Sequence, residues 1–188
     1  MDSAKIIEII AQAISIAAMV VYFLSYQQKK QRTAIFLQLI ATTLFSTSFF
    51  LLGAMMGFIL NLISAVRAVL FMFKKQLKTD NLAWLIVFMA AYAACYVMTF
   101  TVFKTEFTPL NALLEFCPVI GMVATHFGFR AKSAKAVRIS GLVNEPAWMV
   151  YNIAAFSIGA IASNVFSITS IVIGFIRLDK KGKSTDEQ

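Results

Sequence analysis

The stretch TAIFLQLIATTLFSTSFFLLGAMMGFILNLISAVRAVLFMF (residues 33–73) decides the fold. It is about twice as long as the ~20 apolar residues that one membrane-spanning helix needs. Arg67 is the only charged residue inside it, and basic residues adjoin both of its ends. Gly53 and Gly57 near its middle predict a tight hairpin. The stretch therefore predicts two antiparallel transmembrane helices whose open ends face the same side of the membrane.

Basic residues occupy every second gap between the apolar runs of this chain. Because basic loops are retained on the cytoplasmic side, this alternation predicts an N-terminus outside and a C-terminus in the cytoplasm. The net charge of +8 therefore reflects topology. We expect the lipid bilayer as a partner and no nucleic acid. The clusters are Lys29, Lys30 and Arg32; Lys74, Lys75 and Lys78; Arg130, Lys132, Lys135 and Arg138; and Arg177, Lys180, Lys181 and Lys183.

The composition indicates a polytopic membrane protein. Hydrophobic residues make up 60% of the 188 residues and charged residues only 14%, and a soluble domain of this size has too little interior to bury so much apolar surface. The leader MDSAKIIE mixes acidic and basic residues, so the first apolar run predicts a retained helix rather than a cleaved signal peptide. The predicted spans are 6–24, 34–52, 54–73, 82–103, 108–127, 137–156 and 158–177.

The order of spans and loops repeats within the chain. Shifting the sequence by 103 residues aligns Ala17–Phe71 with the second half without a gap, and it places Asn61 on Asn164 and Ser64 on Ser167. Two units in the same orientation need one extra helix between them to restore direction. The predicted fold is all-α: two parallel three-helix bundles (1–78 and 106–178) joined by a linker helix (79–105), with a cytoplasmic tail (179–188).

Most of the chain carries the pattern of a known family. The segments LSYQQKK, RTAIFLQ, FFLLGAMMG, CPVIGMV and GFIRLDKKG, with their intervening polar and glycine positions, resemble the YgjV family of bacterial inner-membrane proteins. The resemblance implies an inner-membrane location and no particular activity.

The 3+1+3 arrangement is also similar to the SWEET, SemiSWEET and PQ-loop group. That resemblance implies that an Asn on the third helix of each unit faces a sugar pocket, and Asn61 and Asn164 occupy these places. Trp148 matches the group's aromatic on the preceding helix. The group usually has a proline in the first two helices of each unit. Pro118 and Pro146 fit the second unit, but 6–24 and 34–52 contain no proline, so four-proline gating is not implied.

Arg67 is a charged residue within a predicted membrane span, and its position has two interpretations. An Arg within a span costs free energy unless it reaches the headgroups or faces the protein interior. One interpretation is that it snorkels to the cytoplasmic headgroups. The other is that it forms an intramembrane ion pair with Glu145, which lies at a comparable depth in span 137–156; such a pair can be purely structural.

Polar residues at helical spacing predict two facing polar arcs. Asn61, Ser64 and Arg67 form one arc, and Asn164, Ser167 and Ser170 form the other. With Trp148 and Asn152 on the Glu145 face, they suit a small polar, sugar-like solute. The alternative is that these amides and hydroxyls only join helices. The candidate binding residues are Asn61, Asn164, Trp148, Ser64, Ser167 and Asn152.

The sequence contains no enzyme motif, metal-ligand spacing or cofactor fingerprint, so we expect neither catalysis nor a cofactor. Cys95 and Cys117 are interpreted as apolar residues within spans, and His126 as an interfacial anchor or a proton relay. Tyr22 and Tyr26 lie near a predicted span end and are interpreted as part of an aromatic belt at the membrane surface.

The first hypothesis is a small-solute carrier, and the alternative is a non-transporting partner or assembly factor. A polar cavity between Asn61 and Asn164 would favour the carrier. The sequence leaves the substrate and homo-oligomerisation open.

Overall fold

The structure is a computed structural model that describes residues 3–53, 55–154 and 158–179 of the chain. Within these residues the regular secondary structure is entirely helical. Each of the seven predicted spans coincides with one long helix, and the short α4 within a basic loop was not predicted. The helices are α1 (Ser3–Tyr26), α2 (Gln31–Leu51), α3 (Met55–Met72), α4 (Lys74–Leu77), α5 (Leu82–Thr101), α6 (Pro109–Arg130), α7 (Ala134–Ala154), α8 (Ile158–Gly174) and the π-helix η1 (Phe175–Asp179).

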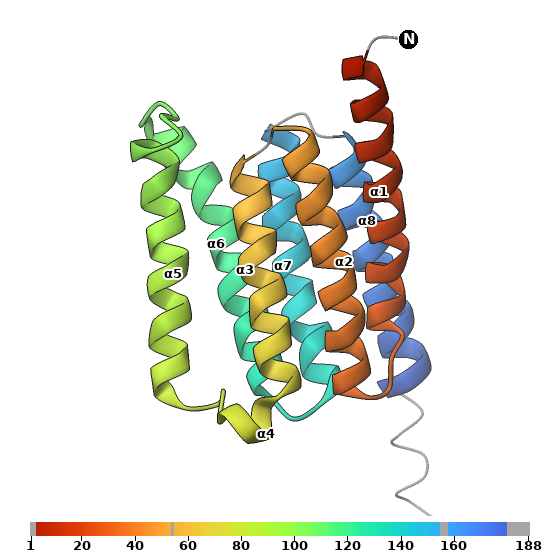
Figure 1. Cartoon of the computed structure of the whole chain (residues 1–188). Coiled ribbons are helices and arrows are strands. Elements are labelled where there is room, and N and C mark those ends of the chain that lie inside the picture. The colour runs from red at the N-terminus through yellow and green to blue at the C-terminus, as the bar shows by residue number, and fades with distance from the viewer. Residues whose placement is uncertain (1–2, 54, 155–157, 180–188) are drawn as a thin grey trace, which may run out of the picture.

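The long helices stand side by side, and consecutive ones alternate in direction (Figure 1). α1 begins at the upper end of this view, whereas α4 and the turn between α6 and α7 lie at the lower end. The predicted hairpin between α2 and α3 forms at Gly53, whose φ of 71° is left-handed. Gly57 instead lies inside α3, where a Cβ would stand 2.8 Å from the ring of Phe49. Gly57 therefore serves helix packing and not the turn.

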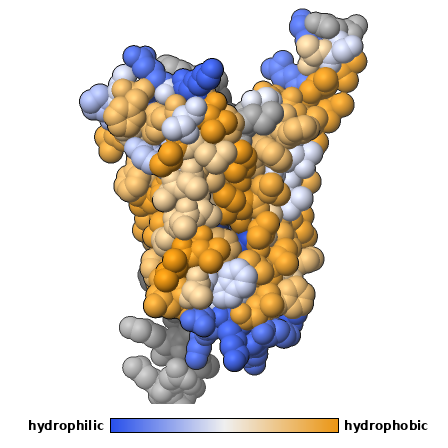
Figure 2. Space-filling view, turned by 60° about the vertical axis from the view of Figure 1, so that its left-hand side comes forward, coloured by the Kyte–Doolittle hydropathy of each residue, from blue (hydrophilic) through white to orange (hydrophobic). Residues whose placement is uncertain are grey.

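The face of the molecule in Figure 2 carries a broad apolar band, and hydrophilic residues lie at its lower and upper ends. Exposed apolar side chains such as Ile16, Ile86 and Ile153 are more than half accessible. Monomeric soluble proteins rarely expose so much contiguous apolar surface, whereas lipid contact accounts for it. Exposed lysines at the lower end include Lys29, Lys30, Lys75, Lys78, Lys132 and Lys135.

Five helical segments are long and apolar enough to cross a membrane: Ser3–Tyr26, Gln31–Leu51, Leu82–Thr101, Pro109–Arg130 and Ala160–Leu178. Two of the seven predicted spans do not meet this requirement. α3 offers the shorter apolar helix Gly57–Met72, and α7 carries Lys135, Arg138 and Glu145. Arg138, predicted to belong to a basic loop, is buried and donates to the backbone oxygens of Tyr26 and Gln28 near the end of α1.

The helix contacts define a ring. α2 contacts α3, α3 contacts α6, α6 contacts α7, and α7 contacts α2. α1 packs on α2 and α8, α8 packs on α7, and α5 packs beside α6 and α3 at one edge of the molecule (Figure 1). α3 and α7 therefore face each other across the ring, with α2 and α6 between them.

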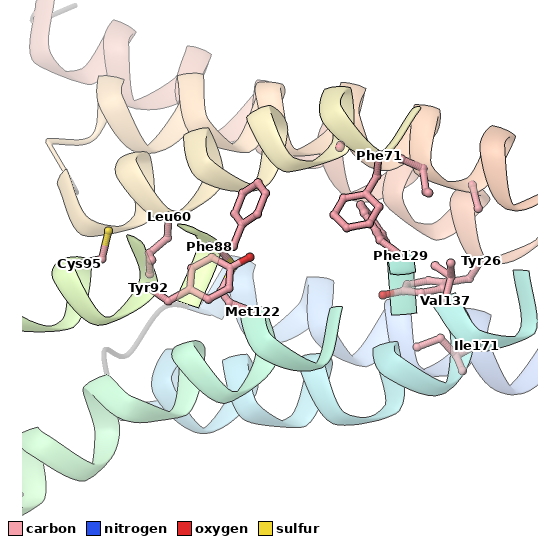
Figure 3. Packing of buried hydrophobic residues seen from close by; sticks show 13 residues of the cluster. Tyr26, Leu60, Phe71, Phe88, Tyr92, Cys95, Met122, Phe129, Val137 and Ile171 are labelled. Carbon is pink, nitrogen blue, oxygen red and sulfur yellow. The ribbon is translucent and has the colours of Figure 1, made fainter. Parts of the chain in front are cut away.

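The buried interior is packed with aromatic and aliphatic side chains (Figure 3). Phe71 and Phe129 meet edge to face with ring centres 5.8 Å apart, and Val137 and Ile171 are fully buried near Tyr26. α6 and α7 approach closely because Gly128 packs directly against Ser140, and a Cβ on Gly128 would stand 2.7 Å from the Cβ of Ser140.

The C-terminal end of α6 is capped by side chains from the first half of the chain. Lys74 of α4 donates to the carbonyl oxygens of Arg130 and Ala131, and Gln31 of α2 donates to that of Ala131 at 2.6 Å. These bonds satisfy carbonyls that have no partner within the helix. Burial lowers the pKa of Lys74 below its usual value, against the opposing effect of Asp80. The caps join the two halves at the lower end of the molecule.

Candidate functional site

A cavity of about 90 Å³ lies within the helix ring. Its lining on α2 extends from Gln38 to Phe49, a length of about 16 Å at 1.5 Å per residue. One enclosed water needs roughly 10–15 Å³ of such space, so the cavity has room for several waters or a small solute. The predicted site residues that line it are Asn61, Ser64, Arg67, Glu145, Trp148, Asn152 and Asn164; Ser167 is buried outside it.

Glu145 on α7 is the centre of a polar network. Its carboxylate accepts hydrogen bonds from Tyr26 Oη at 2.9 Å, Asn144 Nδ2 at 3.0 Å and Asn164 Nδ2 at 2.9 Å. Asn152 Nδ2 in turn donates to Asn164 Oδ1 at 2.8 Å. All three groups on the carboxylate are donors, and they come from α1, α7 and α8. The acid is therefore held by directed hydrogen bonds and not by a neighbouring cation.

Arg67 on α3 is 3% exposed and does not reach the headgroups. Its Nη1 donates to Tyr92 Oη and to the Met122 carbonyl oxygen, both at 2.9 Å. Its guanidinium lies over the ring of Phe129, 5.1 Å from the ring centre. Nε is buried without an acceptor, and among the described residues Nη2 has none. Arg67 thus faces the interior, as one of the two interpretations predicted.

The predicted ion pair between Arg67 and Glu145 is not formed in this structure. Both residues line the cavity, but each is held by other partners, and within the described part of the chain no salt bridge joins them. Their helices, α3 and α7, stand on opposite sides of the ring with α2 and α6 between them. The two charges therefore share one cavity without direct contact.

The equivalent amides of the two halves differ in their surroundings. Asn164 is buried within the Glu145 network, whereas Asn61 donates to the Gly57 carbonyl oxygen of its own helix at 2.9 Å. Ser64 lies 3.1 Å from the Met122 sulfur. Ser167 Oγ is buried without a partner. Of this pair, Asn61 is thus the amide with spare hydrogen-bonding capacity on the cavity wall.

The family model Imp-YgjV, described as "Bacterial inner membrane protein", matches residues 9–182 of the chain. The chain belongs to this family. With its apolar helices, this makes it a multi-pass protein of the bacterial inner membrane. No curated protein and no solved structure matches it, so the similarity to the SWEET group rests on the sequence pattern alone.

Two tyrosines of this YgjV-family protein have a role that the sequence reading missed. Tyr22 and Tyr26 were predicted to lie in an aromatic belt at the membrane surface. Instead Tyr22 lines the cavity, and Tyr26 is 2% exposed and bonded to Glu145. A signal was present in the small residues Ala11, Ala18 and Ser25, whose seven-residue spacing marks the buried face of α1. Tyr22 and Tyr26 lie close to that face.

His126 is also placed differently from the prediction of an interfacial anchor. It is fully buried, and its ring contacts those of Phe71 and Phe88 with centres 5.2 and 5.1 Å apart. Neither ring nitrogen has a hydrogen-bond partner. Among the described residues of this family member, no group of three His, Cys, Asp or Glu side chains is arranged to hold a metal ion.

Asn144 is another cavity-lining residue that was not predicted from the sequence. It directly follows the apolar pair Leu142 and Val143, so no polar pattern marked it.

Proposed function

We propose that this inner-membrane protein is a carrier for a small polar solute, with one binding site in the cavity between its two halves. The observation that carries the proposal is the lining of that cavity. Amides from both halves, Asn61 and Asn164, face one space together with the indole of Trp148. Buried polar groups in a membrane cost free energy unless water, protein or a ligand satisfies them. A cavity that has polar groups in its wall and that packing has not filled suits a ligand.

The internal repeat supports a site on a symmetry axis. A shift of 103 residues relates pairs of positions in the two halves, and in several pairs both members line the cavity. Chance similarity between apolar helices does not predict that equivalent positions share one wall. The pairs are Tyr22 and Thr125, Thr42 and Glu145, Phe45 and Trp148, Phe49 and Asn152, and Asn61 and Asn164.

The helix contacts support the 3+1+3 architecture in the same way. A two-fold relation that exchanges α1 with α6, α2 with α7 and α3 with α8 turns the α1–α8 contact into the α6–α3 contact and leaves α2–α7 unchanged. All three contacts occur. We therefore propose two SWEET-like units, residues 1–78 and 106–178, with residues 79–105 as the linker. In this arrangement α3 and α7 complete the seven spans. α7 can span the membrane although it carries charged residues, because neighbouring helices shield part of its surface from lipid.

A carrier also needs elements that can move. Pro118 and Pro146 lie inside α6 and α7, where each proline removes one backbone hydrogen bond and makes bending less costly. α1 and α2 contain no proline. We propose that the second unit bends against a stiffer first unit. Neither an enzymatic step nor a cofactor is part of the proposal.

Cysteine accessibility tests the site. In a variant with Cys95→Ala and Cys117→Ala, Asn61→Cys lines the cavity and should react with a small hydrophilic thiol reagent. The matched control is Ser167→Cys, which is buried outside the cavity and should stay unlabelled. If Asn61→Cys is unreactive from both sides of the membrane, the carrier proposal fails. The alternative, a non-transporting partner or assembly factor, would then be the better account.

A further inference from the structure

We infer that the cavity binds a small zwitterionic solute, one that carries both a carboxylate and an ammonium group. This inference rests on the proposed carrier function and names its substrate class. It follows from two ionisable groups that face one cavity and form no salt bridge with each other among the described residues, Arg67 and Glu145.

Arg67 supplies the site for the carboxylate. A guanidinium has five N–H donors, and only Nη1 meets protein acceptors here. These acceptors, a phenol oxygen and a backbone carbonyl, are both uncharged. Arg67 is only 3% exposed. Among the described residues, no anionic group forms a salt bridge with its guanidinium. A buried charge is expensive unless it is paired. An anionic group in the cavity would supply the missing partner.

Glu145 supplies the site for the ammonium. An ionised carboxylate offers about four acceptor positions, and Tyr26, Asn144 and Asn164 occupy three of them. The carboxylate lines the cavity. Its remaining position lies within reach of the Tyr22 hydroxyl, which also lines the cavity and which a charged donor can displace. An ammonium is a donor with no acceptor, so it matches that position.

Pairing and charge balance together select a solute with both groups, because a neutral solute adds no net charge but leaves both residues without an ionic partner. Arg67 and an ionised Glu145 together contribute no net charge to the cavity. A simple anion would leave the filled cavity with one uncompensated negative charge, and a simple cation with one positive charge. A zwitterion pairs both residues and adds no net charge, so it avoids the desolvation cost of an unpaired ion.

The remaining wall limits the size and shape of the solute. The cavity is about 90 Å³, so the solute has few heavy atoms. Phe45, Phe49 and Trp148 line it on the side of the α2–α3 hairpin, and such rings suit a short apolar or weakly polar substituent. An amino acid with a small side chain meets all of these conditions.

The test is ligand-dependent thermal stabilisation of the purified full-length protein, because specific binding raises the melting temperature by mass action. The probes are the small amino acids, beginning with L-alanine, and its two deletion analogues: propionate, which lacks the ammonium, and ethylamine, which lacks the carboxylate. Glucose is the neutral polar probe. We expect at least one amino acid to stabilise the protein and its deletion analogues to bind roughly tenfold more weakly or worse, since charged hydrogen bonds are lost.

The other outcomes overturn the inference in distinguishable ways. Binding of propionate as tight as that of alanine would show that the ammonium is not recognised. Stabilisation by glucose without any by amino acids would overturn the zwitterion and leave the carrier proposal intact. No response to any amino acid would also overturn it, whereas only the cysteine-labelling result bears on the carrier proposal itself.

Variants of the two anchors give a second measurement for any amino acid that binds. Glu145→Gln should weaken binding of the amino acid and strengthen binding of its deamino analogue, whose negative charge then balances Arg67, whereas Arg67→Lys should weaken binding of both. Arg67→Lys keeps the charge, so the protein can fold while the geometry of the planar group is lost. If both variants bind the amino acid as tightly as the unmodified protein, the residues do not contact the solute.

Discussion

Asn164 donates a hydrogen bond of 2.9 Å to the carboxylate of Glu145. Its counterpart in the first half, Asn61, donates only to the backbone of its own helix. The position equivalent to Glu145 is Thr42, and the position equivalent to Arg67 is Ser170. Each half therefore contributes one charge that the other lacks. In the proposed two-unit arrangement, equivalent positions thus have different partners around the same cavity, which is the basis of the first prediction.

Asn164→Ala should destabilise the protein more than Asn61→Ala. The first change removes a donor from Glu145 and leaves Asn152 without its acceptor, and buried polar groups left unpaired cost about 1–3 kcal/mol. The second removes one bond within a single helix from a partly exposed residue, so we expect less than about 1 kcal/mol. Thermal melting in detergent provides the comparison. Equal losses would mean that the Glu145 network contributes nothing to stability.

Gly128→Ala should separate α6 from α7. The new methyl group would lie 2.7 Å from the Cβ of Ser140, and overpacking of this kind typically costs about 1–3 kcal/mol. The compensating change Ser140→Gly removes the opposing atoms, so the double variant should melt at a higher temperature than Gly128→Ala alone. Ser140→Gly by itself gives the cost of a helical glycine. A double variant whose losses simply add would place the two residues out of contact.

His126→Leu should leave stability unchanged or raise it. The buried imidazole has no hydrogen-bond partner on either nitrogen, so replacing it with an apolar side chain removes a desolvation cost of roughly 1–3 kcal/mol and retains most of the packing. Phe71→Leu, which loses aromatic contact without such relief, is the control and should lower the melting temperature. A large loss for His126→Leu would point to a hydrogen-bond partner in the membrane.

Reporter fusions should place the C-terminus and the basic loops in the cytoplasm, because the basic clusters occupy every second gap between the apolar runs. A reporter that is active only in the cytoplasm should be active after Lys30, Gln76, Ser133 and Thr185. Fusions after Gly53 and Thr105 should be inactive and serve as controls. Activity at the controls and none at Thr185 would reverse the orientation.

The positions of the helices were readable from the sequence because their causes are local. Within the membrane, an apolar segment has to satisfy its backbone hydrogen bonds internally, and it does so by forming a helix. The length of that helix follows from the length of the apolar segment. Gly53 marked a turn because its backbone conformation favours glycine. The same reasoning predicted that Arg67 could face the interior, since a charge within a span avoids lipid.

The partners of these residues were not readable in the same way. Helices such as α1 and α5 are apolar around most of their circumference, so the sequence gives little contrast between a lipid-facing and a buried side. Tyr26 was therefore assigned to the membrane surface although it is buried against α7 and bonded to Glu145. The rotation of each helix about its axis is set by packing against its neighbours.

The sequence by itself determined the membrane location, the family and the course of the helices, because length, hydropathy and basic clusters act locally along the chain. Only the tertiary structure decided that Arg67 and Glu145 stand apart. Glu145 is held by donors from α1, α7 and α8, and Arg67 by acceptors from α5 and α6. Which donor reaches which acceptor depends on how helices distant in sequence come together, and this is what left the two charges facing one cavity.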